Sequence, residues 1–356
     1  MNGGRITPYD PIVRAIVLVG GAGARLRPLT WRTPKQLVPV LNRPLLEHLL
    51  LHLRRHNVTR ITLAMTERSE AILTTFGDGS ALGINLDYAY EDTPLGSGGA
   101  IASVAQGWDE PFLVCNGDII TDIDLTTMIV FHREHAAELT MHLHEVDDPS
   151  GFGVAVTAPD GRITQFIEKP PRETAPSRLI NAGYWLFEPS LLNEMNPTTF
   201  NRIEDGLFPA LCDAERPIYG FSQPGYWKDV GNPQALLTVN LDLVTGSIPG
   251  QPPADTQGVL IGSGTNIADA DLQAPTVIGP DCQIGQNVTI SGSVLWDHVT
   301  IESGAIIRDS IIASGVTIGR AVKIDRSVIA HGAQIGAGVE MTDTSVEPDE
   351  QIEAGA

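Results

Sequence analysis

Aliphatic residues recur at six-residue intervals in the C-terminal part of this 356-residue chain. Ile278, Ile284 and Ile290 open the pattern, each followed by glycine or serine, and Ile318 and Ile324 return to it. A repeat of this length places one aliphatic side chain inward on every side of a coil, with small or polar residues at the corners. From Gly258 onward, the repeat therefore predicts a parallel β-helix of about four to five coils.

The register of this repeat slips by one residue near Trp296 to Ile301, and Val294, Val299 and Ala305 continue a neighbouring column. We expect a local adjustment at one corner there. A β-helix leaves its ends open to solvent, which favours capping or pairing in a homo-oligomer.

Histidines in the repeat raise one alternative function for the β-helix. Many left-handed β-helix proteins are acyltransferases with a catalytic histidine, and His298 and His331 are the histidines available here. The repeat lacks the long inserted loop that such enzymes use. We therefore assign no active-site residue to the β-helix.

Strands and helices alternate through the preceding residues, which predicts a doubly wound α/β domain. Apolar runs rich in β-branched residues predict strands, and apolar residues at helical spacing predict helices. The expected strands cover residues 15–19, 60–64, 85–89, 111–115, 139–144 and 163–168, and the expected helices cover 45–55, 69–76, 96–106, 125–135 and 233–243. The stretch after the last helix is rich in proline and glycine. We divide the chain into an α/β domain at 1–244, a linker at 245–257 and the β-helix at 258–356.

A glycine-rich loop follows the first strand, at the edge where parallel sheets bind ligands. Gly20, Gly21 and Gly23 let backbone N–H groups approach an anion, and Arg25 and Lys35 add positive charge. The loop lacks the Gly-Lys-Ser/Thr of a Walker A motif, and its glycine spacing does not match the dinucleotide fingerprint. These residues favour a polyphosphate site.

The loop resembles the signature of sugar-1-phosphate nucleotidyltransferases, Gly-Gly-x-Gly-Thr-Arg-Leu-x-Pro-Leu-Thr followed by Pro-Lys. Residues 20–30 match it with Ala24 in place of Thr, which removes an accessory hydrogen-bond donor, and Pro34 and Lys35 complete it. Over the whole chain the sequence is most similar to mannose-1-phosphate guanylyltransferases. That resemblance implies a Rossmann-like doubly wound domain joined to a left-handed β-helix, acting on an NTP and a sugar-1-phosphate with Mg²⁺.

The resemblance also implies roles for individual residues. Arg25 and Lys35 would be catalytic, acting on the triphosphate and on the α-phosphoryl group or leaving pyrophosphate. The expected nucleotide-binding residues are Gly20, Gly21, Gly23, Glu91, Gly96, Asn116 and Gly117, and those expected for the sugar phosphate are Gly153, Glu168, Lys169 and Asn181.

Two aspartates are candidate magnesium ligands. Asp118 follows the strand at 111–115, where a carboxylate beside the phosphate loop suits an ion whose coordination shell is completed by substrate phosphates. Asp229 lies in a segment that matches the second metal-ligand motif of the family. Together they predict a shared Mg²⁺ site.

Glu91 is a candidate for reading the base. A carboxylate can accept both adjacent donors of guanine, whereas thymine and uracil suit an amide better. Family members that read pyrimidines carry Gln at this position, so Glu91 favours GTP. Alternatively, Glu91 caps its loop and backbone groups read the base.

His142 and His144 fall on one face of the strand at 139–144, a spacing capable of binding a metal. Since no third ligand is near in sequence, we expect them to face solvent.

The composition argues against nucleic acid and membranes as binding partners. A formal charge of −20 argues against nucleic acid, which requires a basic surface. The sequence has neither an apolar run of about 20 residues nor a signal core after Met1, so we expect a cytoplasmic protein that does not bind membranes.

Two alternative functions stay open at this point. The sugar could be another hexose or a cyclitol phosphate, and the nucleotide could be that of a glucose-1-phosphate thymidylyl- or adenylyltransferase. A catalytically silent regulatory or sensor subunit is the alternative of another class, which the presence of Arg25, Lys35, Asp118 and Asp229 disfavours.

Overall fold

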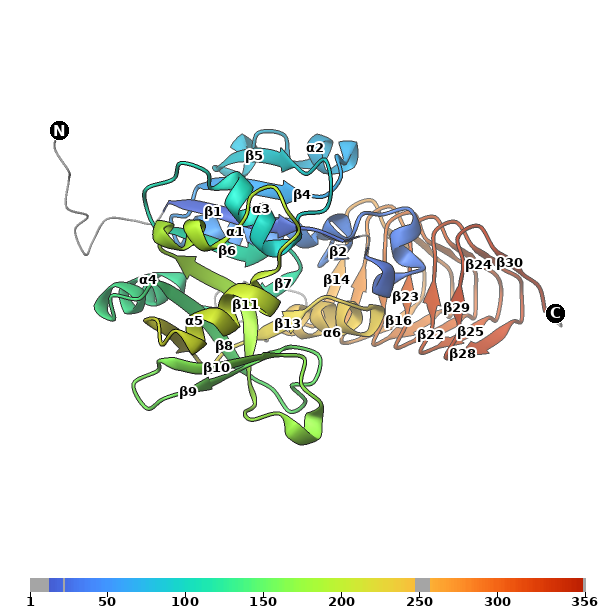
Figure 1. The fold of residues 1–356 in the computed structure, drawn as a ribbon. Coiled ribbons are helices and arrows are strands. Elements are labelled where there is room, and N and C mark those ends of the chain that lie inside the picture. Colours follow the sequence, from blue (N-terminus) through green and yellow to red (C-terminus); the bar gives the residue numbers. More distant parts are fainter. Residues whose placement is uncertain (1–12, 22, 247–256, 355–356) are drawn as a thin grey trace. The chain divides into compact units, whose positions relative to one another are not determined.

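The computed structural model describes residues 13–21, 23–246 and 257–354 and divides into two compact units (Figure 1). The first unit holds the chain through Gly20 and Leu49–Trp227, and the second holds Gly21–His48 and the chain from Lys228 onward. We call residues 21–48 the signature segment; they are grouped with the β-helix. Most of the expected linker, residues 247–256, lies outside the described residues, and the domain boundaries drawn from the sequence stay a prediction.

A nine-stranded mixed sheet forms the centre of the first unit. Four parallel strands lie in the order β5-β4-β1-β6. Next to β6 lies β11, which is antiparallel to it and also pairs with β9, and β10 follows β9 at the edge. Strand β8 pairs with β11 and with β12. The bounds are β1 Arg14–Val19, β4 Arg60–Met65, β5 Asn85–Tyr90, β6 Phe112–Asn116, β8 Leu139–Glu145, β9 Gly153–Thr157, β10 Ile163–Glu168, β11 Leu179–Phe187 and β12 Ile218–Ser222. The parallel strands and the helices between them confirm the expected α/β class.

The helices begin close to the expected residues. Ser69 caps α2 by accepting the N–H of Ile72 at 3.4 Å, and Asp124 caps α4 by accepting that of Thr127 at 3.1 Å. The bounds are α1 Leu45–Arg55, α2 Glu70–Phe76, α3 Gly96–Val104, α4 Leu125–Glu134, α5 Phe208–Asp213 and α6 Pro233–Val244, with the short strands β7 Ile119–Thr121 and β13 Trp227–Asp229.

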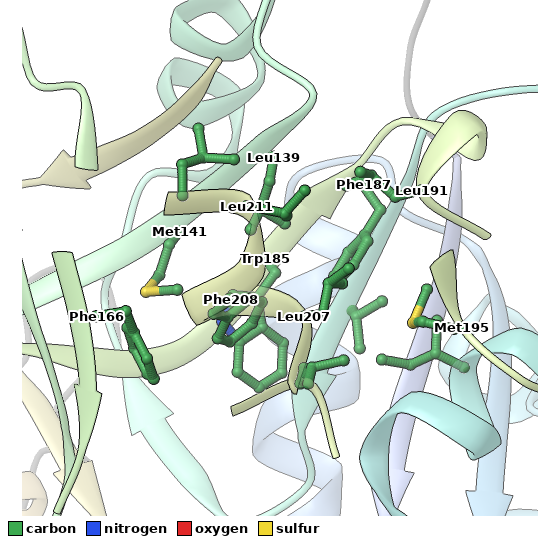
Figure 2. Packing of buried hydrophobic residues seen from close by; sticks show 14 of the residues in the cluster. Leu139, Met141, Phe166, Trp185, Phe187, Leu191, Met195, Leu207, Phe208 and Leu211 are labelled. Carbon is green, nitrogen blue, oxygen red and sulfur yellow. The ribbon is translucent and has the colours of Figure 1, made fainter. Parts of the chain in front are cut away.

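Large buried side chains hold the sheet and α5 together in the first unit (Figure 2). Phe208 of α5 packs against Trp185 of β11 and Phe166 of β10, with ring centroids 6.0 and 5.2 Å apart. Phe187 stacks on Phe112 of β6 at 5.7 Å. Because this packing fixes β6, β10 and β11 relative to one another, it fixes the polar residues at their ends.

The expectation that His142 and His144 face solvent is wrong for His142, which is buried. Residues 139–143 of its strand, β8, are all buried, so both faces of the strand are covered there, and His142 lies near Tyr184 of β11. Burial lowers the pKa of both His142 and His52 from 6.5 to about 3. The buried Nδ1 of His142 and Nε2 of His52 have no hydrogen-bond partner within the described part of the chain.

Three sheets of short parallel strands form the β-helix of the second unit, which confirms the prediction from the repeat (Figure 1). The first sheet holds β14 Val259–Ile261, β17 Thr276–Ile278, β20 Val294–Leu295, β23 Ile311–Ile312, β26 Val328–Ile329 and β29 Ser345–Val346. The second holds β15 Asn266–Ile267, β18 Gln283–Ile284, β21 Thr300–Ile301, β24 Thr317–Ile318, β27 Gln334–Ile335 and β30 Gln351–Ile352. The third holds β16 Asp271–Gln273, β19 Thr289–Ser291, β22 Ile306–Arg308, β25 Lys323–Asp325 and β28 Glu340–Thr342.

The spacing of the repeat differs from the sequence expectation. Val277 pairs with Val294 and Val294 with Ile311, so one coil takes 17 residues. Each coil has one five-residue side, as from Ile290 to Leu295 and from Ile307 to Ile312. The expected single corner adjustment is therefore wrong, because the shift recurs in every such coil and its side lies just before Trp296. Two sheets have six strands, which exceeds the four to five coils expected, because the strands run from Val259 to Ile352 at 17 residues per coil.

The signature segment is attached to α6 and to the first coils of the β-helix. Its strands β2 (Pro39–Val40) and β3 (Arg43–Pro44) form a small antiparallel pair. Asn240 of α6 accepts the N–H of Leu41 at 2.8 Å, and the amide of Asn42 donates to the carbonyl of Ile278 at 2.8 Å. Side-chain amides thus satisfy backbone groups of the segment.

Candidate active site

A cavity of about 320 Å³ opens at the carboxyl ends of β1, β4 and β6 in the first unit. The loop after β5 and the start of α3 form its other wall. Its lining residues are Leu18, Gly20, Ala64, Thr66, Glu91, Pro94, Gly96, Ser97, Ala100, Asn116, Asp118 and Phe200. The cavity has the size and position of a ligand site in an open α/β sheet.

Five of the predicted residues meet at this cavity: Gly20, Glu91, Gly96, Asn116 and Asp118. Gly117 is predicted with them, but it is buried, and its N–H donates to the carbonyl of Leu18 at 3.0 Å. A Cβ at Gly117 would lie 3.1 Å from that carbonyl oxygen, so glycine permits the close approach of β6 to β1.

Glu91 lines the cavity and also holds its own loop. Its Oε2 accepts the N–H of Leu95 at 2.9 Å, just before α3. This is the loop-capping contact left open from the sequence. The carboxylate therefore combines a structural bond with a position at the cavity.

Phe200 belongs to the cavity wall, although no motif marks it. Its side chain is 66% exposed, while its loop is fixed to α3: Asn201 donates its N–H to Leu95 at 2.8 Å and accepts that of Gly98 at 3.0 Å. An exposed aromatic ring in a well-anchored polar loop suits stacking on a bound ligand. The only sequence signal is a phenylalanine among Pro, Thr and Asn residues.

The residues predicted for the sugar phosphate lie on adjacent strands of the same sheet. Gly153 of β9 pairs with Glu168 of β10, and Val154 pairs with Ile180, next to Asn181 of β11. A Cβ at Gly153 would lie 2.3 Å from the Phe166 ring and 2.9 Å from Oε2 of Glu168. Glycine at this position therefore leaves room for the carboxylate.

Asn181 and Lys169 have defined conformations. The Oδ1 of Asn181 accepts the N–H of Gly183 at 3.2 Å and the indole N–H of Trp185 at 2.9 Å, which orients the amide. Lys169 has a φ of 48°, and its N–H donates to the carbonyl of Phe152 at 3.0 Å. Its ammonium lies 3.3 Å from Glu168, so the two residues form an ion pair.

Arg202 is a second residue that sequence reasoning missed. Its guanidinium lies 3.4 Å from Glu168, 3.6 Å from Glu204 and 2.8 Å from Asp205. Ser97 of the cavity wall donates to Glu204 at 2.7 Å. Hydrogen bonds and ion pairs therefore connect the cavity wall to Glu168.

Gly183 brings the sugar-phosphate residues to the cavity. It has a φ of 75°, and a Cβ there would lie 2.8 Å from the Nδ2 of Asn116. Because β11 is antiparallel to β6, its first residues lie at the edge where β6 ends. The two predicted groups of the first unit therefore share one edge of the sheet.

The second unit holds the other predicted residues: Gly21, Gly23, Arg25, Lys35 and Asp229. Lys35 is buried, and a Cβ at Gly23 would lie 3.2 Å from its Cβ. Gly23 has a φ of 61°, and its carbonyl accepts the hydroxyl of Thr30 at 2.8 Å. The guanidinium of Arg25 lies 3.9 Å from Asp229. The glycine loop, Lys35 and Asp229 are thus gathered in one unit.

The two candidate magnesium ligands fall in different units, Asp118 in the first and Asp229 in the second. Their shared metal site stays a prediction. Over residues 13–21, 23–246 and 257–354, no cluster of three or more His, Cys, Asp or Glu side chains is arranged to hold a metal ion by itself. Mg²⁺ commonly uses one or two carboxylates plus substrate phosphates, so this donor set suits it.

Across the described residues, none of the helices has the length and apolar character needed to cross a membrane.

Comparison with known proteins identifies both domains. Residues 14–246 match the family model described as "Nucleotidyl transferase", and residues 255–341 match "EIF2B subunit epsilon LbH domain", which is a left-handed β-helix. The chain is 37% identical over 299 residues to "Mannose-1-phosphate guanylyltransferase" of Mycobacterium tuberculosis, covering 83% of each chain.

Two further relatives match at similar coverage. The chain is 34% identical over 306 residues to "Mannose-1-phosphate guanylyltransferase 1" of Arabidopsis thaliana, covering 83% of each. It is 32% identical over 330 residues to "UTP--glucose-1-phosphate uridylyltransferase" of a Synechocystis strain, covering 82% of this chain and 85% of that one.

Solved structures support the fold of the first domain. The crystal structure of HddC from Yersinia pseudotuberculosis superposes with a TM-score of 0.56 at 23% identity, covering 65% of this chain and 99% of that one. A putative glucose-1-phosphate thymidylyltransferase from Bacillus anthracis, in complex with sucrose, gives 0.55 at 24%, covering 64% and 93%. The matched domain, its signature loop and the cavity at its strand ends lead to one conclusion: the chain belongs to the nucleotidyl transferase family and carries a C-terminal left-handed β-helix.

Proposed function

We propose that this protein transfers a guanylyl group from GTP to mannose-1-phosphate or a related hexose or cyclitol phosphate. The similarity to mannose-1-phosphate guanylyltransferases over 83% of the chain, including part of the β-helix, carries this proposal. The carboxylate of Glu91 at the cavity supports guanine, because it can accept both donors of that base.

An oxygen of the sugar phosphate attacks the α-phosphorus of the NTP in line, and pyrophosphate leaves. The attacking phosphate is already ionised, so the protein acts by positioning and by neutralising charge. The glycine loop and Arg25 bind the triphosphate, and Lys35 contacts the α-phosphoryl group or the leaving pyrophosphate. Lys169 holds the attacking phosphate, while Glu168 and Asn181 bind sugar hydroxyls.

Asp118 and Asp229 are the residues proposed to hold Mg²⁺. Bound there, the ion would neutralise charge on the phosphates, which is what these reactions require of a divalent cation. Asp118 lines the cavity, and the carboxylate of Asp229 lies beside Arg25, a residue proposed to bind the triphosphate, which supports this assignment.

A second candidate is transfer of a pyrimidine nucleotide to glucose-1-phosphate. The uridylyltransferase relative covers 82% of this chain, and one oxygen of Glu91 is engaged by Leu95. If Glu91 only caps its loop, the preference for guanine has no side-chain basis.

Pyrophosphate release tests these candidates directly. The purified chain is incubated with Mg²⁺, each NTP in turn and a panel of sugar-1-phosphates. We expect release with GTP and mannose-1-phosphate or a related sugar. Release only with UTP, dTTP or ATP would overturn the guanine assignment, and no release with any pair would favour a catalytically silent subunit.

A further inference from the structure

Two neighbouring coils of the β-helix hold the part of the signature segment that precedes Lys35. The Nε2 of His331 lies 3.2 Å from the carbonyl oxygen of Leu29 and 3.1 Å from the hydroxyl of Thr33. Both oxygens of Asp349 pair with the guanidinium of Arg32. We call His331 and Asp349 the clamp, and all of these residues belong to the second unit.

The hydrogen bond to Leu29 defines the state of the His331 ring. A carbonyl oxygen only accepts, so Nε2 carries the proton and donates it, and the Thr33 oxygen shares the same donor. The ring is buried and packs against Trp296 with centroids 5.2 Å apart. Burial also lowers the pKa of His331, which keeps the ring neutral. Packing thus holds one N–H toward the signature segment.

The two clamp residues support one another. Asp349 donates its N–H to the carbonyl of His331 at 2.9 Å, so they lie at the corners of adjacent coils. One and two coils before His331, the corresponding residues are Ser314 and Asp297, whose side chains hydrogen-bond to each other. Ser314 and Asp297 thus pair with each other, whereas His331 at the same corner position contacts the signature segment.

The clamped residues stand directly before Lys35. Thr33 is followed by Pro34, whose φ is −50°, and Lys35 then opens a short 3₁₀ helix in which Leu37 donates to Pro34 at 2.8 Å. Proline restricts the backbone, so the position of Thr33 limits where Lys35 can lie. Lys35 is buried, and a Cβ at Gly23 would lie 3.2 Å from its Cβ, so the Gly23 turn lies close to the start of the Lys35 side chain.

We propose that His331 and Asp349 are positioning residues for nucleotidyl transfer, through which the β-helix fixes the backbone at residues 29–33 and thereby the reach of Lys35. This inference rests on the role proposed above for Lys35. It gives the β-helix a part in the reaction without placing any of its residues on the substrate.

Two substitutions at His331 distinguish the role of its N–H donor from that of its ring packing. His331→Phe keeps a ring against Trp296 and removes the donor, whereas His331→Gln keeps a side-chain N–H. We expect His331→Phe to lower kcat at least tenfold, with the KM of both substrates within twofold of wild type, and His331→Gln to recover most of the loss. Rates are divided by the folded fraction at the assay temperature. A wild-type kcat for His331→Phe would overturn the proposal.

A matched pair of carboxylates tests the ion pair. Asp343 also lies at a corner with positive φ and also pairs with an arginine, but its partner Arg326 belongs to the β-helix itself. We expect Asp349→Asn to lower kcat severalfold and Asp343→Asn to leave it unchanged. Equal effects of the two substitutions would mean general destabilisation and would contradict the clamp.

A double variant separates this inference from the proposed function. If the clamp acts through Lys35, His331→Phe should cause little further loss in a Lys35→Ala background. A loss by the same factor in both backgrounds would overturn the clamp and leave the proposed function standing. A wild-type chain without turnover on any substrate pair would overturn both.

Discussion

The guanidinium of Arg25 lies 3.9 Å from Oδ2 of Asp229, so a residue proposed to bind the triphosphate is paired with one proposed to bind magnesium. Arg25 is 71% exposed in its side chain and Asp229 only 23%. The pair balances charge around the carboxylate. A magnesium nucleotide would replace this contact with phosphate oxygens on the arginine and a cation on the carboxylate.

Replacing Arg25 should therefore impair activity far more than stability. We expect Arg25→Ala to lower kcat/KM by at least tenfold, because the proposed charged contact to phosphate would be lost. The free energy of unfolding should change by less than about 1 kcal/mol, as for other exposed ion pairs. Pyrophosphate release and chemical denaturation measure the two effects. Arg43→Ala, which breaks the exposed pair with Glu47 in the same segment, is the control and should leave activity unchanged.

Lys35 should be needed for the chemical step more than for nucleotide binding. Loss of one buried charge that stabilises the transition state costs roughly 3 kcal/mol, or about a hundredfold in rate. We expect Lys35→Ala to retain NTP affinity by calorimetry while kcat falls by this factor. Since the side chain is buried, Lys35→Met serves as a second variant that keeps the apolar packing. Wild-type turnover by either folded variant would remove Lys35 from the mechanism.

Glu91→Gln separates base recognition from loop capping. A glutamine carbonyl can still accept the N–H of Leu95, so stability should be preserved. It offers one acceptor in place of the two that guanine requires, so we expect kcat/KM for GTP to fall about tenfold or more relative to UTP and dTTP. Unchanged discrimination among nucleotides would assign Glu91 to its loop alone.

The buried histidines of the first unit should make the protein sensitive to acid. The pKa of His52 and of His142 is lowered to about 3 in the fold, while the unfolded chain takes up protons near pH 6.5. Their contribution to stability is therefore complete above pH 6.5 and is lost as the pH falls toward 3. Each of the two histidines should lower the free energy of unfolding by about 2 kcal/mol between neutral pH and pH 5.

Urea denaturation at a series of pH values measures this loss. Below pH 6, the free energy of unfolding should depend on pH less steeply in His142→Gln than in the wild type, by about 1.4 kcal/mol per pH unit. This difference in slope is expected whatever the substitution does to stability at neutral pH. An unchanged slope would show that His142 does not carry the effect.

Several site residues were accessible from the sequence because they lie in short local motifs, most of which were assigned through the family resemblance. Glycines before a helix, a carboxylate after a buried strand and a six-residue aliphatic period depend on residues close together in the chain. The first unit accordingly brings Gly20, Glu91, Gly96, Asn116 and Asp118 to one cavity. Phe200 and Arg202 carried no such signal, because their positions depend on contacts with α3 and Glu168.

By itself, the sequence determined the α/β class, the β-helix and the loop that marks the family, since each is written in short-range periodicity or spacing. Only the tertiary structure decided that both faces of β8 are covered over residues 139–143, which buries His142. It also decided that His331 reaches Leu29, 302 residues away in the chain. Contacts of that span depend on how whole elements pack, and no local pattern encodes them.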